Sequence, residues 1–102
     1  MPDPESSLPI QAPARPATDP TEPGLLPPWK VLLHNDDVND MPYVVQTISQ
    51  LTPLSQSAAT QRMLEAHAKG LALILTTHQE RAELYRDQFA SKNLSVTIEP
   101  DA

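Results

Sequence analysis

The sequence predicts a small α+β domain in which a three-stranded antiparallel sheet packs against three helices in the order β-α-α-β-α-β. Three observations carry this prediction. Residues 29–36, 71–76 and 93–99 are short and rich in β-prone apolar residues. The segments between them repeat apolar residues at helical spacing, and turn or capping residues separate the elements.

The first strand is expected in "WKVLLHND", residues 29–36, which opens with apolar residues and closes in Asn and Asp. Side chains alternate across a strand, so Trp29, Val31 and Leu33 share one face. The polar ending of this segment predicts a turn directly after the strand.

Two helices are expected next. Residues 40–51 carry an amphipathic stripe with Asn39 or Asp40 as N-cap and Pro42 in the first turn; the stripe consists of Met41, Val44, Val45, Ile48 and Leu51. A second helix should run from about Gln56 to Lys69, capped by Ser55 and ended by Gly70. One side of it carries Ala59, Met63, Ala66 and His67.

The last three elements follow from the same patterns. "LALILT", residues 71–76, predicts a short buried strand, and "TTHQE" offers capping boxes that pair Thr77 with Glu80 or Thr76 with Gln79. A third helix should then run to about Lys92, with Ala82, Tyr85 and Phe89 facing inward. In residues 93–99, apolar and polar residues alternate, which predicts a strand with one solvent-exposed face. Its apolar residues are Leu94, Val96 and Ile98.

Residues 1–28 hold nine of the twelve prolines and show no helical or strand period. We expect them to form a disordered, proline-rich N-terminal arm, and residues 29–102 to form the folded core. The arm lacks the basic start and apolar block of a secretory signal. No apolar stretch is long enough to span a bilayer.

Charge and cysteine content exclude several classes of function. Residues 29–102 carry six Lys/Arg and nine Asp/Glu, a balance that argues against binding a nucleic-acid backbone. The chain has no cysteine, so it forms neither disulfides nor thiolate metal sites. We expect a monomer that binds neither nucleic acid nor membrane, and the cytoplasm as its location.

The stretch "HNDDVND", residues 34–40, concentrates six hydrogen-bonding side chains at the end of the first strand. A calcium loop is disfavoured, because its positions six and twelve require Gly and Glu and here hold Asp40 and Gln46. An enzyme is disfavoured as well, since there is no nucleophile elbow or glycine-rich phosphate loop, and adjacent Asp36 and Asp37 point apart on an extended segment.

Two interpretations of this stretch stay open. Turn chemistry explains one or two Asn and Asp residues, because their side chains cap the local backbone. A receptor for an ammonium group explains more of them, because a protonated amine offers three donors that carboxylate and amide oxygens accept. A His returning from elsewhere would add another acceptor. His67 shares its helical face with Met63 and Ala66, although a His on an apolar face is more often an ordinary core residue.

"WKVLLHNDDVNDMPYVV", followed about twenty residues later by "ATQRMLEAHAKG", resembles the ClpS family over residues 29–99. The resemblance implies an adaptor, without catalysis, cofactor or metal, that delivers N-degron substrates to a Clp AAA+ protease. The bound partner is the first residue of a substrate, with a free α-amino group and a bulky Leu, Phe, Tyr or Trp side chain. A second implied partner is the N-terminal domain of the Clp ATPase.

The resemblance also implies roles for individual residues. The α-amino group would be bound by Asn35, Asp36, Asp37 and His67. The hydrophobic pocket would be gated by Met41 and lined by Val44, Met63, Ala66 and Leu94. The rim would consist of Val38, Asn39 and Asp40. Docking to the ATPase would involve Glu80 and the position of Tyr85.

The sequence departs from the family pattern at three places. Asn39 and Asp40 replace a Thr-Pro pair, which predicts a more acidic rim and a preference for a basic or polar second residue. Ala66 replaces a branched aliphatic residue, which predicts a wider pocket that favours Trp or Phe over Leu. Tyr85 replaces a docking Lys and equally fits the core. A diverged domain of the same fold that binds peptides without serving a protease is therefore the alternative.

Overall fold

The computed structural model describes residues 26–101, so the arm predicted over residues 1–28 lies almost entirely outside the described residues. Only its last three positions are described. Pro28 is half-buried, and its carbonyl accepts a 2.8 Å hydrogen bond from the backbone N–H of Asp101. The segment that enters the first strand is thus tied to the end of the last one.

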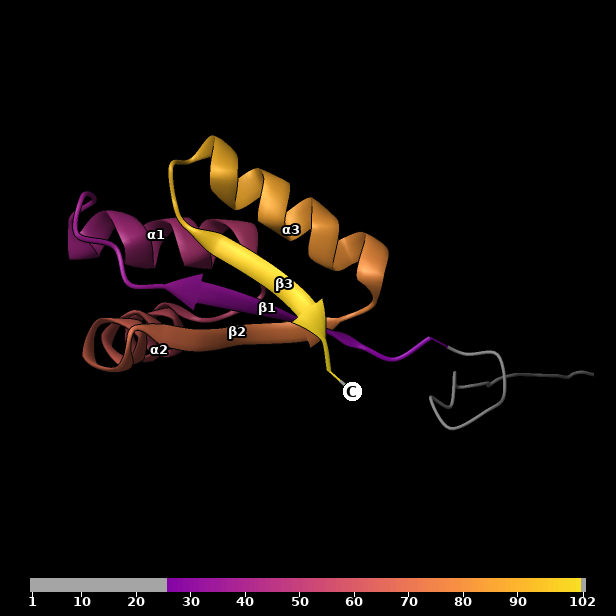
Figure 1. Ribbon diagram of the computed structural model, residues 1–102. Helices are drawn as coiled ribbons and strands as arrows, with labels where there is room; N and C mark the ends of the chain where they lie inside the picture. The colour runs from indigo at the N-terminus through magenta and orange to yellow at the C-terminus, as the bar shows by residue number, and fades with distance from the viewer. Residues whose placement is uncertain (1–25, 102) are drawn as a thin grey trace, which may run out of the picture.

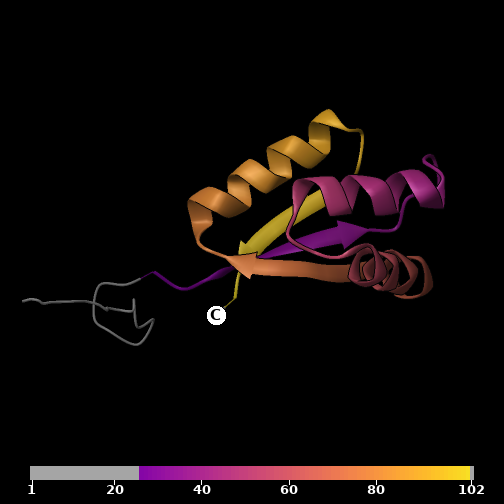
Figure 2. The ribbon, with the colours of Figure 1, turned by 180° about the vertical axis from the view of Figure 1, so that it is seen from behind.

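Within residues 26–101, the elements follow the predicted order. They are β1 (Trp29–His34), α1 (Met41–Leu51), α2 (Gln56–Lys69), β2 (Leu71–Thr77), α3 (Gln79–Ser91) and β3 (Val96–Pro100). The sheet has the strand order β2-β1-β3, and β1 is antiparallel to both neighbours. The three helices cover one face of this sheet (Figures 1 and 2), which confirms the predicted α+β architecture.

The core lies between the sheet and the helices. The central strand β1 contributes Val31 and Leu33, which are completely buried together with Ile48 of α1 and Phe89 of α3. Leu32 points to the opposite face and is still buried, because it is flanked by Leu73 on one side and Thr97 on the other. Burying β1 between two strands fixes where its polar end emerges, and that end is the start of the candidate site.

The predicted helix boundaries at three positions are confirmed. The Asp40 carboxylate accepts a 2.8 Å hydrogen bond from the Tyr43 N–H at the start of α1. The Ser55 hydroxyl accepts one from Ala58 N–H at the start of α2. Gly70 ends α2 with φ +89°, a left-handed conformation that glycine adopts without steric cost.

The start of α3 differs from the prediction. Its N-cap is His78, whose Nδ1 accepts a 3.2 Å hydrogen bond from Arg81 N–H, and neither predicted capping box with Thr76 or Thr77 forms. Both threonines still belong to β2, where they pair with Lys30 and Trp29 of β1. Because Thr76 and Thr77 extend the pairing of β2 with β1, they cannot cap α3, and the next residue, His78, is its N-cap.

The last strand also begins later than predicted, at Val96 instead of Asn93. Asn93 has a positive φ of 66° in the turn after α3, a conformation that Asn tolerates better than most residues. Leu94 follows in the same turn and is buried in the core. The Asn93 carbonyl accepts a hydrogen bond from the Asn39 side chain, so the turn after α3 lies beside the polar stretch that follows β1.

Candidate functional site

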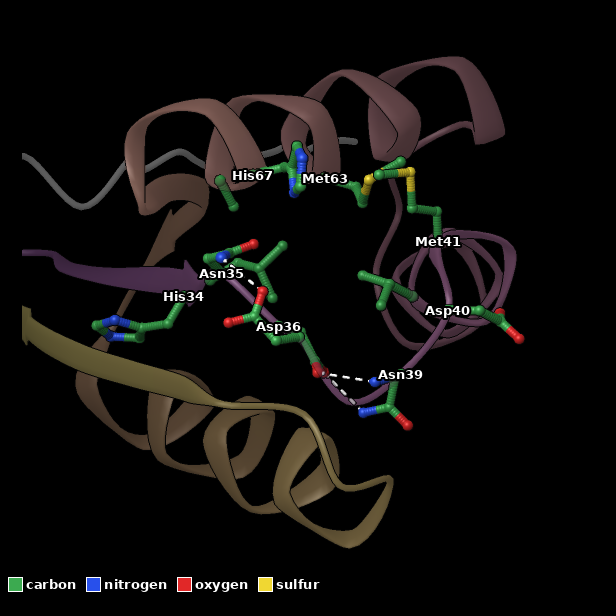
Figure 3. Close-up of a pocket in the computed structure, with 12 residues that line it drawn as sticks. His34, Asn35, Asp36, Asn39, Asp40, Met41, Met63 and His67 are labelled. Atoms are coloured by element: carbon green, nitrogen blue, oxygen red, sulfur yellow. Dashed lines mark hydrogen bonds between the residues drawn. The ribbon is translucent and has the colours of Figure 1, made fainter.

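A cavity of about 390 Å³ opens where β1, the turn after it, α1 and α2 meet. In Figure 3, Asn35, Asp36 and Asn39 lie on one side of it, and His67, Met63 and Met41 lie on the other. The lining residues are Leu33, His34, Asn35, Asp36, Asp37, Asn39, Asp40, Met41, Val44, Met63, Ala66 and His67. The structure thus brings ten of the fourteen predicted site residues together around one space.

Asp36 holds the turn in shape. Its Oδ1 accepts hydrogen bonds from the backbone N–H groups of Val38 at 2.8 Å and Asn39 at 2.9 Å. Its Oδ2 accepts a third from the Asn39 side-chain amide at 2.7 Å (Figure 3). With three donors already on this carboxylate, Asp36 acts mainly as the local cap of the turn, which is the turn chemistry that the sequence left open.

These hydrogen bonds also set the charge of Asp36. Partial burial by itself raises the pKa of the Asp36 carboxyl, but the hydrogen bonds from Asn39 and Val38 outweigh that effect. The resulting pKa is lower than the ordinary value. Asp36 is therefore a carboxylate throughout the neutral range and adds negative charge to the polar side of the cavity.

The turn is anchored to two other parts of the fold. The Asn39 side-chain amide donates a second hydrogen bond, 2.9 Å long, to the backbone carbonyl of Asn93 in the turn after α3. The Tyr43 hydroxyl donates to the Lys92 carbonyl, also at 2.9 Å. On the other side, the N–H of Asn35 donates to the carbonyl of Gly70 at the end of α2. The position of the polar groups is thus set by contacts far apart in the sequence.

Asn35, Asp37 and His67 are the groups best placed to receive a ligand. The Asn35 amide donates to Asp37 Oδ1 at 3.2 Å, which brings an amide oxygen and a carboxylate to the same side of the cavity. Asp37 is exposed and accepts this one hydrogen bond among the described residues. His67 approaches from α2, one helical turn beyond Met63 (Figure 3).

The apolar side of the cavity is made by α1, α2 and the end of β1. Val44, Ala66 and Leu33 are buried beneath it, and Met63 is nearly so. Met41 is 43% exposed and stands at the opening. In Figure 3 the side chains of Met41 and Met63 point toward one another across the top of α1.

Some of the predicted residues lie elsewhere. Val38 is 92% exposed and does not line the cavity, because the turn held by Asp36 directs it outward. Leu94 does not line the cavity either, since it packs into the core from the turn after α3. Tyr85 is also a core residue, with Arg81 stacked 5.9 Å from its ring centre, whereas Glu80 is exposed in the first turn of α3.

The prediction omitted two residues that line the cavity. Leu33 is the last inward-facing residue of β1 before the turn, and its place at the end of a predicted strand was the signal that pointed to it. His34 lines the cavity too, but its ring points away (Figure 3) toward β3, where Nε2 lies 2.7 Å from the Thr97 hydroxyl.

Within residues 26–101, no helix is both long and apolar enough to cross a membrane. In the same range, no group of three or more His, Asp or Glu side chains is arranged to hold a metal ion.

Comparison with known proteins agrees with this fold. Residues 26–97 match the family described as "ATP-dependent Clp protease adaptor protein ClpS". The adapter protein ClpS of Synechococcus elongatus is 47% identical over 78 residues, which are 76% of this chain and 82% of that protein. The chloroplastic adapter CLPS1 of Arabidopsis thaliana is 37% identical over 76% of this chain and 49% of its own.

A solved structure has the same fold. Agrobacterium tumefaciens ClpS2, determined bound to L-phenylalaninamide, aligns with a TM-score of 0.65 and 23% identity, over 74% of this chain and 98% of that one. The family match covers more than two thirds of the chain, and the Synechococcus relative covers three quarters of it. The chain therefore belongs to the ClpS family of ATP-dependent Clp protease adaptor proteins.

Proposed function

We propose that this adaptor recognises the free α-amino group and the bulky hydrophobic first residue of N-degron substrates, and delivers them to a Clp AAA+ protease. The observation that carries the proposal is the two-sided cavity, in which hydrogen-bond acceptors face an apolar pocket across about 390 Å³. A first residue presents the same two features, an ammonium group and a side chain, on one Cα atom. The role is binding, without catalysis or cofactor.

The polar side suits an ammonium group. An α-amino group has a pKa of about 7.7–8.0 and is largely protonated at neutral pH, with three donors and no acceptor. Asn35 and Asp37 offer oxygens, and the His67 ring offers a nitrogen from α2, on the side opposite Asn35 (Figure 3). Acetylation would remove the charge and two of the donors, leaving these acceptors unpaired.

The apolar side suits a Leu, Phe, Tyr or Trp side chain. Burying such a side chain contributes roughly 1.5–3 kcal/mol, and Val44, Met63 and Ala66 offer the surface for it. The Agrobacterium relative was solved with L-phenylalaninamide, a ligand that combines a free amino group with a benzyl side chain. Because Ala66 is small, we infer a preference for Phe and Trp over Leu.

The rim supports a preference at the second residue. Asp37 and Asp40 are exposed beside the cavity, and Asp36 carries a negative charge next to them. A basic second residue would be attracted by this rim and an acidic one repelled. Asn39 contributes less to this preference than its sequence position suggests, because its amide is occupied by Asp36 and the Asn93 carbonyl.

The partner for delivery is the N-terminal domain of a Clp ATPase. We place its contact at the exposed start of α3, which carries Glu80, and not at Tyr85, which is buried. We further propose a monomeric adaptor in the cytoplasm. The alternative is a peptide-binding domain of this family that is no longer coupled to a protease.

Calorimetric titration with peptide pairs tests the recognition step. Peptides starting with free Leu, Phe, Tyr or Trp should bind, and their Nα-acetylated copies should bind weaker by on the order of a hundredfold or more, because the acceptors lose a charged partner. Equal affinity for free and acetylated copies would refute recognition of the amino group.

Degradation of a fluorescent Phe-initiated reporter by the host Clp ATPase and peptidase tests delivery. The adaptor should accelerate its loss, and Glu80→Lys should reduce that effect while leaving peptide affinity unchanged. Peptide binding without any acceleration would favour the uncoupled alternative.

A further inference from the structure

A second cavity of about 730 Å³ runs as a groove along the seam between α1 and α2. It shares Met41 and Met63 with the cavity between β1, α1 and α2, so the two cavities meet at this methionine pair. The groove is lined by Met41, Pro42, Val45, Gln46, Ser49, Gln50, Gln56, Thr60 and Met63. None of these side chains is charged.

The lining of the groove has a uniform chemistry. Its apolar part is Met41, Pro42, Val45 and Met63, and its rim carries the exposed amides of Gln46, Gln50 and Gln56. The hydroxyls of Ser49 and Thr60 donate to carbonyls of their own helices at 2.9 and 2.8 Å. An amide side chain both donates and accepts hydrogen bonds, as does every peptide unit of an extended chain.

We propose that this groove binds the segment that follows the first residue of the same substrate, as an extended stretch of polypeptide. The inference rests on the proposed function. With the α-amino group at Asn35 and the side chain in the apolar pocket, the carbonyl of the first residue is left at the opening of the cavity, where the exposed Met41 stands. The following chain can therefore continue over Met41 and Met63, where the groove begins.

The size of the groove sets the length of that segment. Met41 and Gln50 are separated by nine residues of α1, which amounts to about 14 Å at the helical rise. An extended chain covers this distance with about four residues. The groove should then contact roughly positions two to five of the substrate, and its lack of charge predicts little dependence on their sequence beyond the second residue.

A length series tests this proposal. Free-amino Phe peptides of two and six residues, with Ala and Ser after the Phe, should differ roughly tenfold in affinity in favour of the longer one. Gln46→Trp, which fills the groove, should reduce the affinity for the longer peptide to that for the shorter. Gln61→Trp is the control, since Gln61 is exposed on α2 outside the groove.

The outcomes separate the two proposals. If both free peptides bind equally, or if Gln46→Trp keeps the length effect, the groove proposal is overturned while recognition of the first residue stands. If the acetylated six-residue peptide binds as well as the free one, recognition of the amino group fails instead.

A paramagnetic label on position five of the bound peptide gives a second readout that needs no variant. It should broaden the amide signals of Gln50 and Gln56 and spare those of Ser95 and Thr97 beside β1. Broadening centred on β3 would place the chain elsewhere and overturn the inference.

Discussion

The two ends of the cavity between β1, α1 and α2 are built in opposite ways. At the polar end, the turn of residues 35–40 is fixed by hydrogen bonds to α2 and to the turn after α3, made by the Asn35 N–H and the Asn39 amide. At the apolar end, the opening is closed by Met41, which is 43% exposed, and by Met63. Methionine is unbranched and adapts to differently shaped partners.

This difference teaches how one small site combines a strict requirement with a tolerant one. When the acceptors are held in fixed positions, a ligand that lacks a donor binds much more weakly. Each acceptor is then removed from water without gaining a hydrogen bond in return. An adaptable apolar wall changes affinity only gradually with ligand shape. The amino group should therefore be required, whereas several bulky first residues should be accepted.

The largest expected effect is at the polar end. His67→Ala should weaken the binding of a free Phe peptide by roughly tenfold to a hundredfold, since a hydrogen bond to a charged group is lost. His78→Asn is a matched control, because it removes a remote His and keeps a good N-cap for α3. Calorimetry on both variants measures the affinity. An unchanged affinity in His67→Ala would count against binding of the amino group by His67.

The next effect concerns the anchoring of the turn. Asn39→Ala removes the hydrogen bonds to Asp36 and to the Asn93 carbonyl, and should lower the free energy of unfolding by about 1–2 kcal/mol. Peptide binding should weaken in parallel, because Asn35 and Asp37 lose their fixed positions. Urea unfolding measures the first effect. An unaltered unfolding midpoint would show that the turn is held by other contacts.

A smaller change is expected at the apolar end. Ala66→Val adds two methyl groups to a side chain that is 2% exposed under the pocket. The narrower pocket should lower the affinity ratio of Trp to Leu peptides by roughly threefold to tenfold, within the range expected for overpacking. Competition between the two peptides measures the ratio. If the ratio rises, the side chain at position 66 does not determine the width of the pocket.

The smallest effect is the pH dependence contributed by Asp36. Because its pKa is lowered in the folded state, its stabilising contribution is complete above the ordinary carboxyl value of about 3.9 and is lost as pH falls through the lowered pKa. Asn39→Ala removes a hydrogen bond that lowers this pKa, so its stability should fall less than that of the wild type below about pH 4. Urea midpoints measured from pH 5 to pH 2 compare the two, and parallel curves would contradict the assignment.

Local patterns in the sequence were sufficient for most of the fold. The caps at Asp40 and Ser55 and the ending at Gly70 depend on residues within one helical turn, and all three predictions are confirmed. The cap of α3 was predicted wrongly, because pairing of Thr76 and Thr77 with β1 is a long-range contact that local preference does not reveal. The outward position of Val38 and the burial of Leu94 were also not readable from a periodic pattern, because both residues lie outside the helices and strands.

The different roles of Asp36 and Asp37 in the polar stretch could not be predicted from the sequence either. Asp36 and Asp37 are chemically identical neighbours, and the resemblance to the ClpS family implied the same role for both at the amino group. In the structure, Asp36 accepts three hydrogen bonds from its own turn, whereas Asp37 is exposed and accepts one. The Asn39 amide that donates to Asp36 also donates to the Asn93 carbonyl, a contact between residues far apart in the sequence.

The most direct test of this account compares Asp36→Asn with Asp37→Asn. For each variant, the ratio of affinities for a free and an acetylated Phe peptide is measured by calorimetry, with urea unfolding alongside. The account predicts that Asp37→Asn lowers the ratio by roughly tenfold at unchanged stability, and that Asp36→Asn lowers stability while largely keeping the ratio. Loss of the ratio in Asp36→Asn alone, with Asp37→Asn behaving as wild type, would contradict it.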